Sequence, residues 1–106
     1  MNTHLNNVVE SERFQTSIAR GRAMSPTIID GAAVRFDKQE KRVTSGEIYA
    51  LWSDIEGLIF RRLFIEKDAV RVVADNPAFP EIKIARDEKN IGSRILGKVT
   101  GLAQRY

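Results

Sequence analysis

Cysteine is absent from the 106 residues of this chain, and histidine occurs once. Without cysteine there is no disulfide framework and no thiolate metal site, which suits a cytosolic protein. The single histidine, His4, lies in a polar N-terminal stretch, and it argues against a histidine-based catalytic triad or a zinc cluster. The sequence therefore predicts no metal and no other cofactor.

Long apolar runs are also missing. No segment approaches the roughly 18 apolar residues that a membrane-spanning helix needs. Residues 1–7 are polar and lead into Glu10, Glu12 and Arg13, which does not fit a signal peptide. We therefore expect a cytoplasmic protein without a membrane partner.

Charge of one sign is not in great excess, because 17 basic residues face 14 acidic ones for a formal net charge of +3. This mild surplus permits contact with nucleic acid but does not require it. Lys38, Lys41 and Arg42 cluster in one expected loop, and such clusters are usually solvated surface. The aromatic residues are scattered and form no stacking platform among the cations, so a basic β-barrel that binds nucleic acid directly is the weaker hypothesis.

What the chain does contain is a series of short segments rich in β-branched and aromatic residues, separated by Gly, Asp, Asn and Pro. This pattern predicts an all-β domain of short, mostly antiparallel strands. The expected strands are residues 14–19, 32–36, 47–53, 58–65, 69–74, 81–84 and 93–104. Turns are expected at 54–57 and 66–68, a break at 75–77, and only a short turn at 25–29. The length fits one domain, over residues 14–106, after a flexible linker remnant at 1–13.

Residues 58–65 alternate between two largely apolar faces, so this strand is expected to be covered on both sides, as in a small barrel or sandwich. Arg61 shares one face with Ile59, Leu63 and Ile65. A charge on an apolar face needs a partner or a route to water. The plainest interpretation is an arginine whose head reaches out of the sheet. Tyr49 and Trp52, on opposite faces of another strand, are interpreted as packing residues.

The most informative segment runs from residue 21 to residue 31 and reads GRAMSPTIIDG. It resembles the active-site segment of the LexA-like self-cleaving repressors, the family of LexA, the UmuD proteins and temperate-phage repressors. The family pattern is Gly-Asp-Ser-Met-x-Pro-x-Ile-x-Asp-Gly, and its serine is the nucleophile. The matching positions are Gly21, Met24, Pro26, Ile28, Asp30 and Gly31.

Four later segments resemble family motifs in the same order: Gly46 to Tyr49, Phe60 to Leu63, Asp75 to Pro80, and Ile95 to Val99. Together they extend the resemblance over residues 14–106. The resemblance implies the compact barrel-sandwich fold of LexA and signal peptidases. It also implies that the family's catalytic lysine corresponds to position 61.

Two departures from the family pattern concern the chemistry itself. The nucleophile position is Ala23, which has no hydroxyl group, and the base position, 61 − 23 = 38 residues later, is Arg61. A buried lysine can be neutral and accept a proton, whereas arginine stays protonated. Arg22 also replaces an acidic residue, and residues 1–22 contain no Ala-Gly or Cys-Gly cleavage site. The resemblance thus predicts a peptidase-like domain that does not cleave.

The function that such a domain would retain is self-association. The resemblance implies a C-terminal domain that forms dimers or larger oligomers of a prophage-type bacterial repressor. Operator DNA would be bound through an N-terminal helix-turn-helix domain that is not in this chain, and an antirepressor protein would relieve repression. The alternative is the catalytic domain of a RecA-stimulated, self-cleaving repressor or SOS protein in an inactivated Ser-to-Ala form.

The dimer contact is expected partly on the last strand, where a free edge would otherwise invite aggregation. The candidate residues are Ile95, Leu96, Val99, Leu102 and Tyr106. An ordinary core strand is the equal alternative. Gly97 and Gly101 would allow a close backbone approach or a bulge.

Overall fold

The computed structural model describes residues 12–87 and 91–104, and these residues form seven strands and no helix of ordinary length. The strands are β1 (Phe14–Ile18), β2 (Ala33–Asp37), β3 (Ile48–Ser53), β4 (Gly57–Ile65), β5 (Ala69–Val73), β6 (Ile82–Ala85) and β7 (Ile95–Ala103). The all-β prediction is confirmed, and each predicted strand is present with ends that differ by two residues at most.

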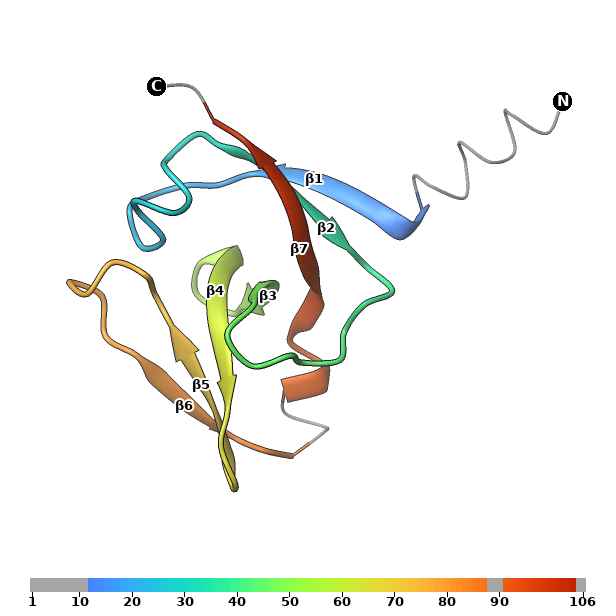
Figure 1. Cartoon of the computed structure of the whole chain (residues 1–106), viewed down its shortest axis with the longest axis vertical. Helices are drawn as coiled ribbons and strands as arrows, with labels where there is room; N and C mark the ends of the chain where they lie inside the picture. Colours follow the sequence, from blue (N-terminus) through green and yellow to red (C-terminus); the bar gives the residue numbers. More distant parts are fainter. Residues whose placement is uncertain (1–11, 88–90, 105–106) are drawn as a thin grey trace, which may run out of the picture.

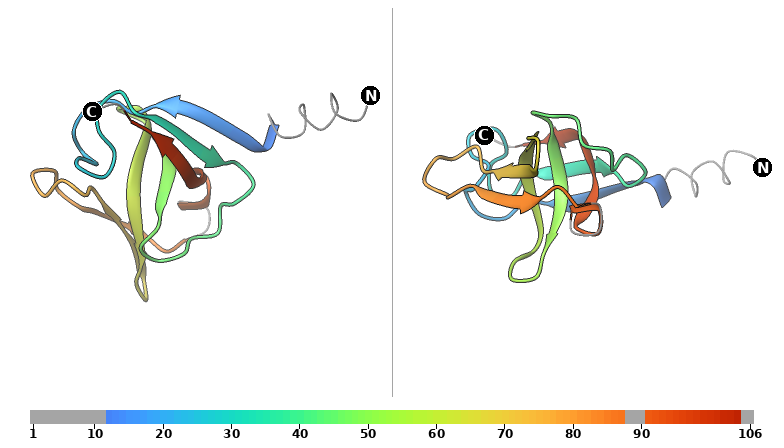
Figure 2. Two further views of the ribbon diagram at one scale, coloured as in Figure 1. Left: turned by 45° about the horizontal axis from the view of Figure 1, so that its top comes forward. Right: turned by 90° about the horizontal axis from the view of Figure 1, so that it is seen from below.

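All seven strands belong to one sheet in the order β1-β2-β7-β3-β4-β5-β6, and every pairing is antiparallel (Figure 1). The sheet is strongly curled, as the two turned views show (Figure 2). Phe36 on β2 meets Phe60 on β4 edge to face, with ring centroids 6.3 Å apart, although β7 and β3 lie between these strands in the sheet. The barrel-like closure is therefore made by one coiled sheet rather than by two separate ones.

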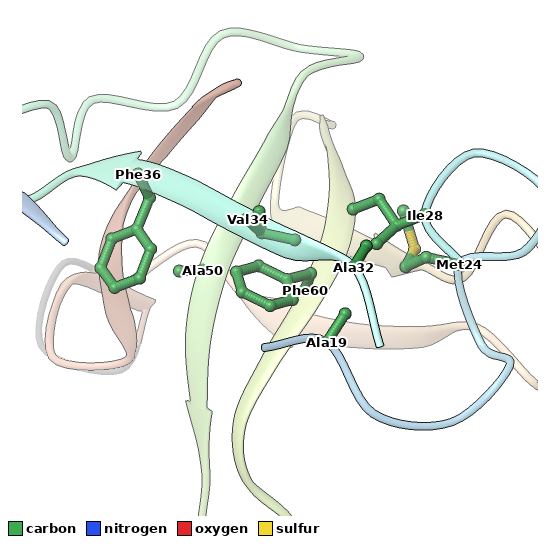
Figure 3. Close-up of a cluster of buried hydrophobic side chains, with 8 residues drawn as sticks. All are labelled: Ala19, Met24, Ile28, Ala32, Val34, Phe36, Ala50 and Phe60. Carbon is green, nitrogen blue, oxygen red and sulfur yellow. The ribbon is translucent and has the colours of Figure 1, made fainter. Parts of the chain in front are cut away.

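The curled sheet packs a hydrophobic cluster on each of its two faces. The first cluster gathers Ala19, Met24, Ile28, Ala32, Val34, Phe36, Ala50 and Phe60 (Figure 3). The second is built on Tyr49, Leu51 and Leu63 from β3 and β4, with β5 residues and Ile91. Because successive side chains of a strand point to opposite faces, β3 and β4 supply both clusters. The expectation that residues 58–65 are covered on both sides is confirmed.

The last strand, β7, is not an edge strand. It pairs with β2 on one side and with β3 on the other, so the free edge expected for residues 93–104 is wrong over that double-paired stretch. The backbone of β2 comes very close to Gly97: a Cβ built on Gly97 would lie 2.2 Å from the carbonyl oxygen of Asp37. The β2–β7 register also shifts between Arg35 and Phe36, which is a bulge. The close approach and the bulge expected near Gly97 and Gly101 are both present.

The turns between strands follow the expected chemistry. Residues 54–56 connect β3 to β4, and Gly57 closes this hairpin with a φ of 79°, a left-handed conformation that favours glycine. Residues 66–68 connect β4 to β5, and residues 74–81 form the loop before β6. These hairpins place β4, which carries Arg61, against β3 with Arg61 opposite Tyr49.

Candidate functional site

The connection between β1 and β2, residues 20–31, is closed on itself by hydrogen bonds. At its base, the Ala19 amide donates to the Ala32 carbonyl and the Gly31 amide donates to the Ala19 carbonyl, both at 2.8 Å. The Asp30 carboxylate accepts from the Gly21 amide at 2.7 Å. Gly21 and Gly31 have φ values of 84° and 88°, which glycine adopts without strain. The glycines and the aspartate of the motif are thus explained by the shape of this loop.

Inside the loop, Met24 and Ile28 are buried in the first cluster, with 4% and 1% of their surfaces exposed. The Ile28 amide donates to the Met24 carbonyl at 2.8 Å, which closes the short turn expected at 25–29. Pro26 lies on this turn, after a cis peptide bond from Ser25. The motif's apolar residues therefore anchor the loop in the core and hold Ala23 next to them.

A second loop, residues 74–81, lies on the same side of the molecule and fastens the first (Figures 1 and 2). The Asn76 amide donates to the Ala23 carbonyl at 2.9 Å, and the Asn76 side chain donates to the Arg22 carbonyl at 3.1 Å. Asp75 accepts two hydrogen bonds from Arg62, at 2.9 and 2.7 Å, and one from Thr27 at 2.5 Å. The Arg62 guanidinium lowers the pKa of the Asp75 carboxyl below its ordinary value, chiefly through these hydrogen bonds.

These contacts place Ala23 and Arg61 on the walls of the same small cavity, of about 100 Å³. Residues of the β1–β2 connection form one wall, and Leu58, Ile59 and Phe60 of β4 form another. The described lining contains no serine, threonine, cysteine, lysine or histidine, so neither Ser25 nor Thr27 stands in for the missing hydroxyl. The two positions that sequence reasoning paired, 38 residues apart (61 − 23), are brought together at one site.

The Arg61 side chain is mostly withdrawn from solvent, with 15% of its surface exposed. One guanidinium nitrogen donates to the Phe60 carbonyl at 2.8 Å. The nearest carboxylate, of Glu56, is 3.8 Å from another nitrogen and is itself 59% exposed. Burial lowers the pKa of Arg61 from its ordinary value, and Glu56 opposes this shift. Arg61 remains a cation, with a weak ion pair, and cannot serve as a general base.

A larger cavity, of about 510 Å³, opens beside the first. Four residues line both cavities, namely Glu56, Ile59, Arg61 and Phe79, so the two cavities adjoin, and we call them together the groove. Trp52, which was interpreted as a packing residue, lies in the wall of the larger part and is 50% exposed. Sequence reasoning also missed Phe79 and Ile82, because alternation shows which face a residue occupies but not whether anything covers that face.

The family comparison fits this geometry. The model of the peptidase S24-like family matches residues 5–100. The chain belongs to this family. It is the family of LexA, UmuD and phage repressors, a serine peptidase family, and the all-β fold of this S24-like domain agrees with that membership. No curated protein matches the chain.

The residues proposed for a dimer contact have different surroundings in this S24-like domain. Ile95 is buried at 2% exposure, and Leu96 and Val99 pack against the first cluster. Leu102 is 42% exposed near the end of β7. Tyr106 and His4 lie outside the described residues, as does most of the expected linker at 1–13. Of the five candidates, Leu102 is the one whose side chain the structure describes as exposed.

Two kinds of feature are absent from residues 12–87 and 91–104. No helix in these ranges is long and apolar enough to cross a membrane. No three His, Cys, Asp or Glu side chains within them gather in a way that could hold a metal ion.

Proposed function

We propose that this domain is the C-terminal oligomerisation module of a prophage-type bacterial transcriptional repressor, peptidase-like in fold but unable to cleave itself. The observation that carries the proposal is that Ala23 and Arg61 line one cavity of an S24-like domain. If these are the nucleophile and base positions, as the motif implies, both parts of the proton-transfer pair are lost. A methyl group cannot attack a carbonyl carbon, and a protonated guanidinium cannot accept the nucleophile's proton.

The two substitutions are independent, and this distinguishes the proposal from its alternative. In the alternative, the domain belongs to a RecA-stimulated, self-cleaving repressor or SOS protein in which a serine has been changed to Ala23. Such a protein would need only Ala23→Ser to recover cleavage. Under our proposal Ala23→Ser remains inactive, because the neighbouring Arg61 still cannot act as the base.

The test is autolysis in the full-length protein at alkaline pH, followed by gel electrophoresis, for the unchanged protein, Ala23→Ser, and Ala23→Ser with Arg61→Lys. We expect no cleavage in the first two. The double variant measures whether the rest of the groove still accepts a cleavage loop. Cleavage by Ala23→Ser alone would establish the alternative and end the proposal.

The retained activity would be assembly. Two domains that associate hold two DNA-binding domains near adjacent half-sites, which raises the apparent affinity for an operator by roughly 10²–10⁴ through effective concentration. Sedimentation velocity over a wide concentration range is expected to show a reversible dimer or larger assembly. Leu102→Asp is expected to weaken it, while Ile55→Asp, on a turn residue that is 95% exposed, is the matched control. A strict monomer at high concentration would exclude the module.

A repressor that cannot cleave itself must be relieved in another way, and we propose a separate antirepressor protein. The groove along Ala23 and Arg61 supports this role, because it is an open hollow that a segment of a partner protein can enter. Arg61→Glu reverses the charge of its wall and is expected to weaken antirepressor binding. Unchanged binding would move the partner's site elsewhere.

A further inference from the structure

The groove has two chemically different parts that meet at one residue. The smaller part, between Ala23 and Arg61, is tight and carries the loop arginines Arg20 and Arg22. The larger part is mostly apolar and lies between β3, β4 and β6. Arg61 lines both, so a ligand that enters the larger part can reach the guanidinium from there.

Positive charge predominates along the whole groove. The smaller part is lined by three cations, Arg20, Arg22 and Arg61, and the larger part adds Lys83 and Arg94. Among the described lining residues these five cations face one carboxylate, that of Glu56. Three of these cations already have a carboxylate partner: Arg94 approaches Asp54 at 3.4 Å, Lys83 approaches Glu66 at 3.5 Å, and Arg61 approaches Glu56 more loosely, at 3.8 Å. No ion pair joins Arg20 or Arg22 to any of the described residues. The unneutralised charge is therefore concentrated in the smaller part.

Arg61 is the deepest of these cations. Its side chain is 15% exposed, and its partner carboxylate, Glu56, lies 3.8 Å away on an exposed turn residue. A hydrogen-bonded carboxylate approaches a guanidinium at about 2.7–2.9 Å, so this pair is loose and does not saturate the donors of Arg61, which lines both parts of the groove. A guanidinium offers its donors as a planar fork that matches a carboxylate in two-point contact.

The larger part of the groove offers apolar contact surface. Trp52, Phe79 and Ile82 are 50%, 39% and 60% exposed, and all three line it. Ile82 belongs to β6, which is the last strand of the sheet and pairs only with β5 among the described strands. An edge strand next to an apolar groove can take up an extended peptide, whose alternate side chains then enter the groove.

We propose that this groove binds an extended, acidic segment of a partner protein, with one carboxylate held by Arg61 beside Ala23 and neighbouring apolar side chains lodged between Trp52 and Ile82. The identity of that partner as an antirepressor rests on the function proposed above, but the peptide chemistry does not. The substitution that removes the family's base thus supplies an anion-binding group at the same place. The methyl side chain at position 23 leaves the approach to that group unobstructed by a hydroxyl.

The test uses blocked synthetic peptides with apolar residues at alternate positions, made in matched pairs that differ only in one glutamate or glutamine. Trp52 is the only tryptophan of the chain, so its fluorescence reports binding without a label. We expect the glutamate peptide to bind about 10- to 100-fold more tightly than the glutamine peptide, as a charged hydrogen bond in a partly buried site would give. This comparison needs no substitution in the protein.

Arg61→Gln is expected to abolish the preference for glutamate while leaving the affinity for the glutamine peptide nearly unchanged. Lys41→Gln removes one exposed positive charge outside the groove, and it is expected to keep the preference. Equal binding of both peptides to the unchanged chain, no binding at millimolar concentration, or an equal effect of the two substitutions would overturn the proposal. Because the assay does not measure self-association or autolysis, its failure leaves the oligomerisation module standing, and the reverse also holds.

Discussion

Gly97 provides a sharp test of the strand arrangement that supports the groove. It lies on β7 opposite Ala50 of β3. On its other side, β3 pairs with β4, the strand that carries Arg61. A methyl group at position 97 would lie 2.2 Å from the carbonyl oxygen and 2.7 Å from the carbonyl carbon of Asp37. Both atoms are backbone, so relief requires β2 and β7 to separate rather than a side chain to rotate.

The cost can be placed on a scale. Overpacking a well-filled interior costs about 1–3 kcal/mol and sometimes more. Because backbone atoms meet the new methyl group, we expect Gly97→Ala to lose about 3 kcal/mol of unfolding free energy. That loss corresponds to a fall of roughly 10–20 °C in the melting temperature of a domain of this size. Urea denaturation and thermal unfolding measure both quantities.

Gly101 is the matched control, since it lies on the same strand and a Cβ built on it meets nothing within 4 Å. Gly101→Ala is expected to be neutral or to stabilise the domain by about 0.4–1 kcal/mol, because alanine restricts the unfolded chain. Gly97→Ala with the stability of the unchanged chain would refute the close approach of β2 and β7. An equal loss of unfolding free energy in both variants would show that the effect comes from replacing any glycine of β7, not from the close contact at Gly97.

Three further predictions concern the core and the loops around the groove. Phe60→Ala is expected to cost about 3–5 kcal/mol in urea denaturation, because Phe60 is 4% exposed, whereas Ile55→Ala, at 95% exposure, should change stability by less than about 0.5 kcal/mol. Asp75→Asn weakens the pairing with Arg62. Because the folded pKa of Asp75 is lowered, its stabilising effect is present above the ordinary aspartate pKa and is lost as pH falls through the folded pKa. The difference in unfolding free energy between Asp75→Asn and the unchanged chain should therefore shrink in acid. A difference that does not depend on pH would contradict the assignment. In Arg61→Lys, the new amine should titrate below the ordinary lysine pKa by NMR, since the same burial acts on it; an ordinary value would show that position 61 is solvated.

The strands could be predicted because their signals are local. Alternation over residues 58–65 and a glycine at the end of the 54–57 turn act within a few residues of the chain. The position of β7 between β2 and β3 depends instead on contacts far apart in sequence, and nothing local separates a central strand from an edge strand. The expectation of a free edge there was wrong for that reason.

The site divides in the same way. Ala23 and Arg61 could be paired in advance because the motif fixes their spacing, and the shared cavity places both at one site. The apolar part of the groove could not be predicted, because Trp52 looks like a core residue in sequence. In the structure it is 50% exposed and lines the larger part of the groove, which alternation along β3 does not reveal.

Burial at position 61 links the proposed loss of self-cleavage to the proposed binding. In a lysine, desolvation favours the neutral amine, which is what a general base requires. In an arginine the same desolvation cannot remove the charge, so the free energy of the half-buried cation stays high until an anion approaches. Glu56 meets this need only loosely, at 3.8 Å from an exposed turn. If position 61 is the family's base position, as proposed, the burial that would favour a neutral lysine there instead favours a bound carboxylate when the residue is arginine.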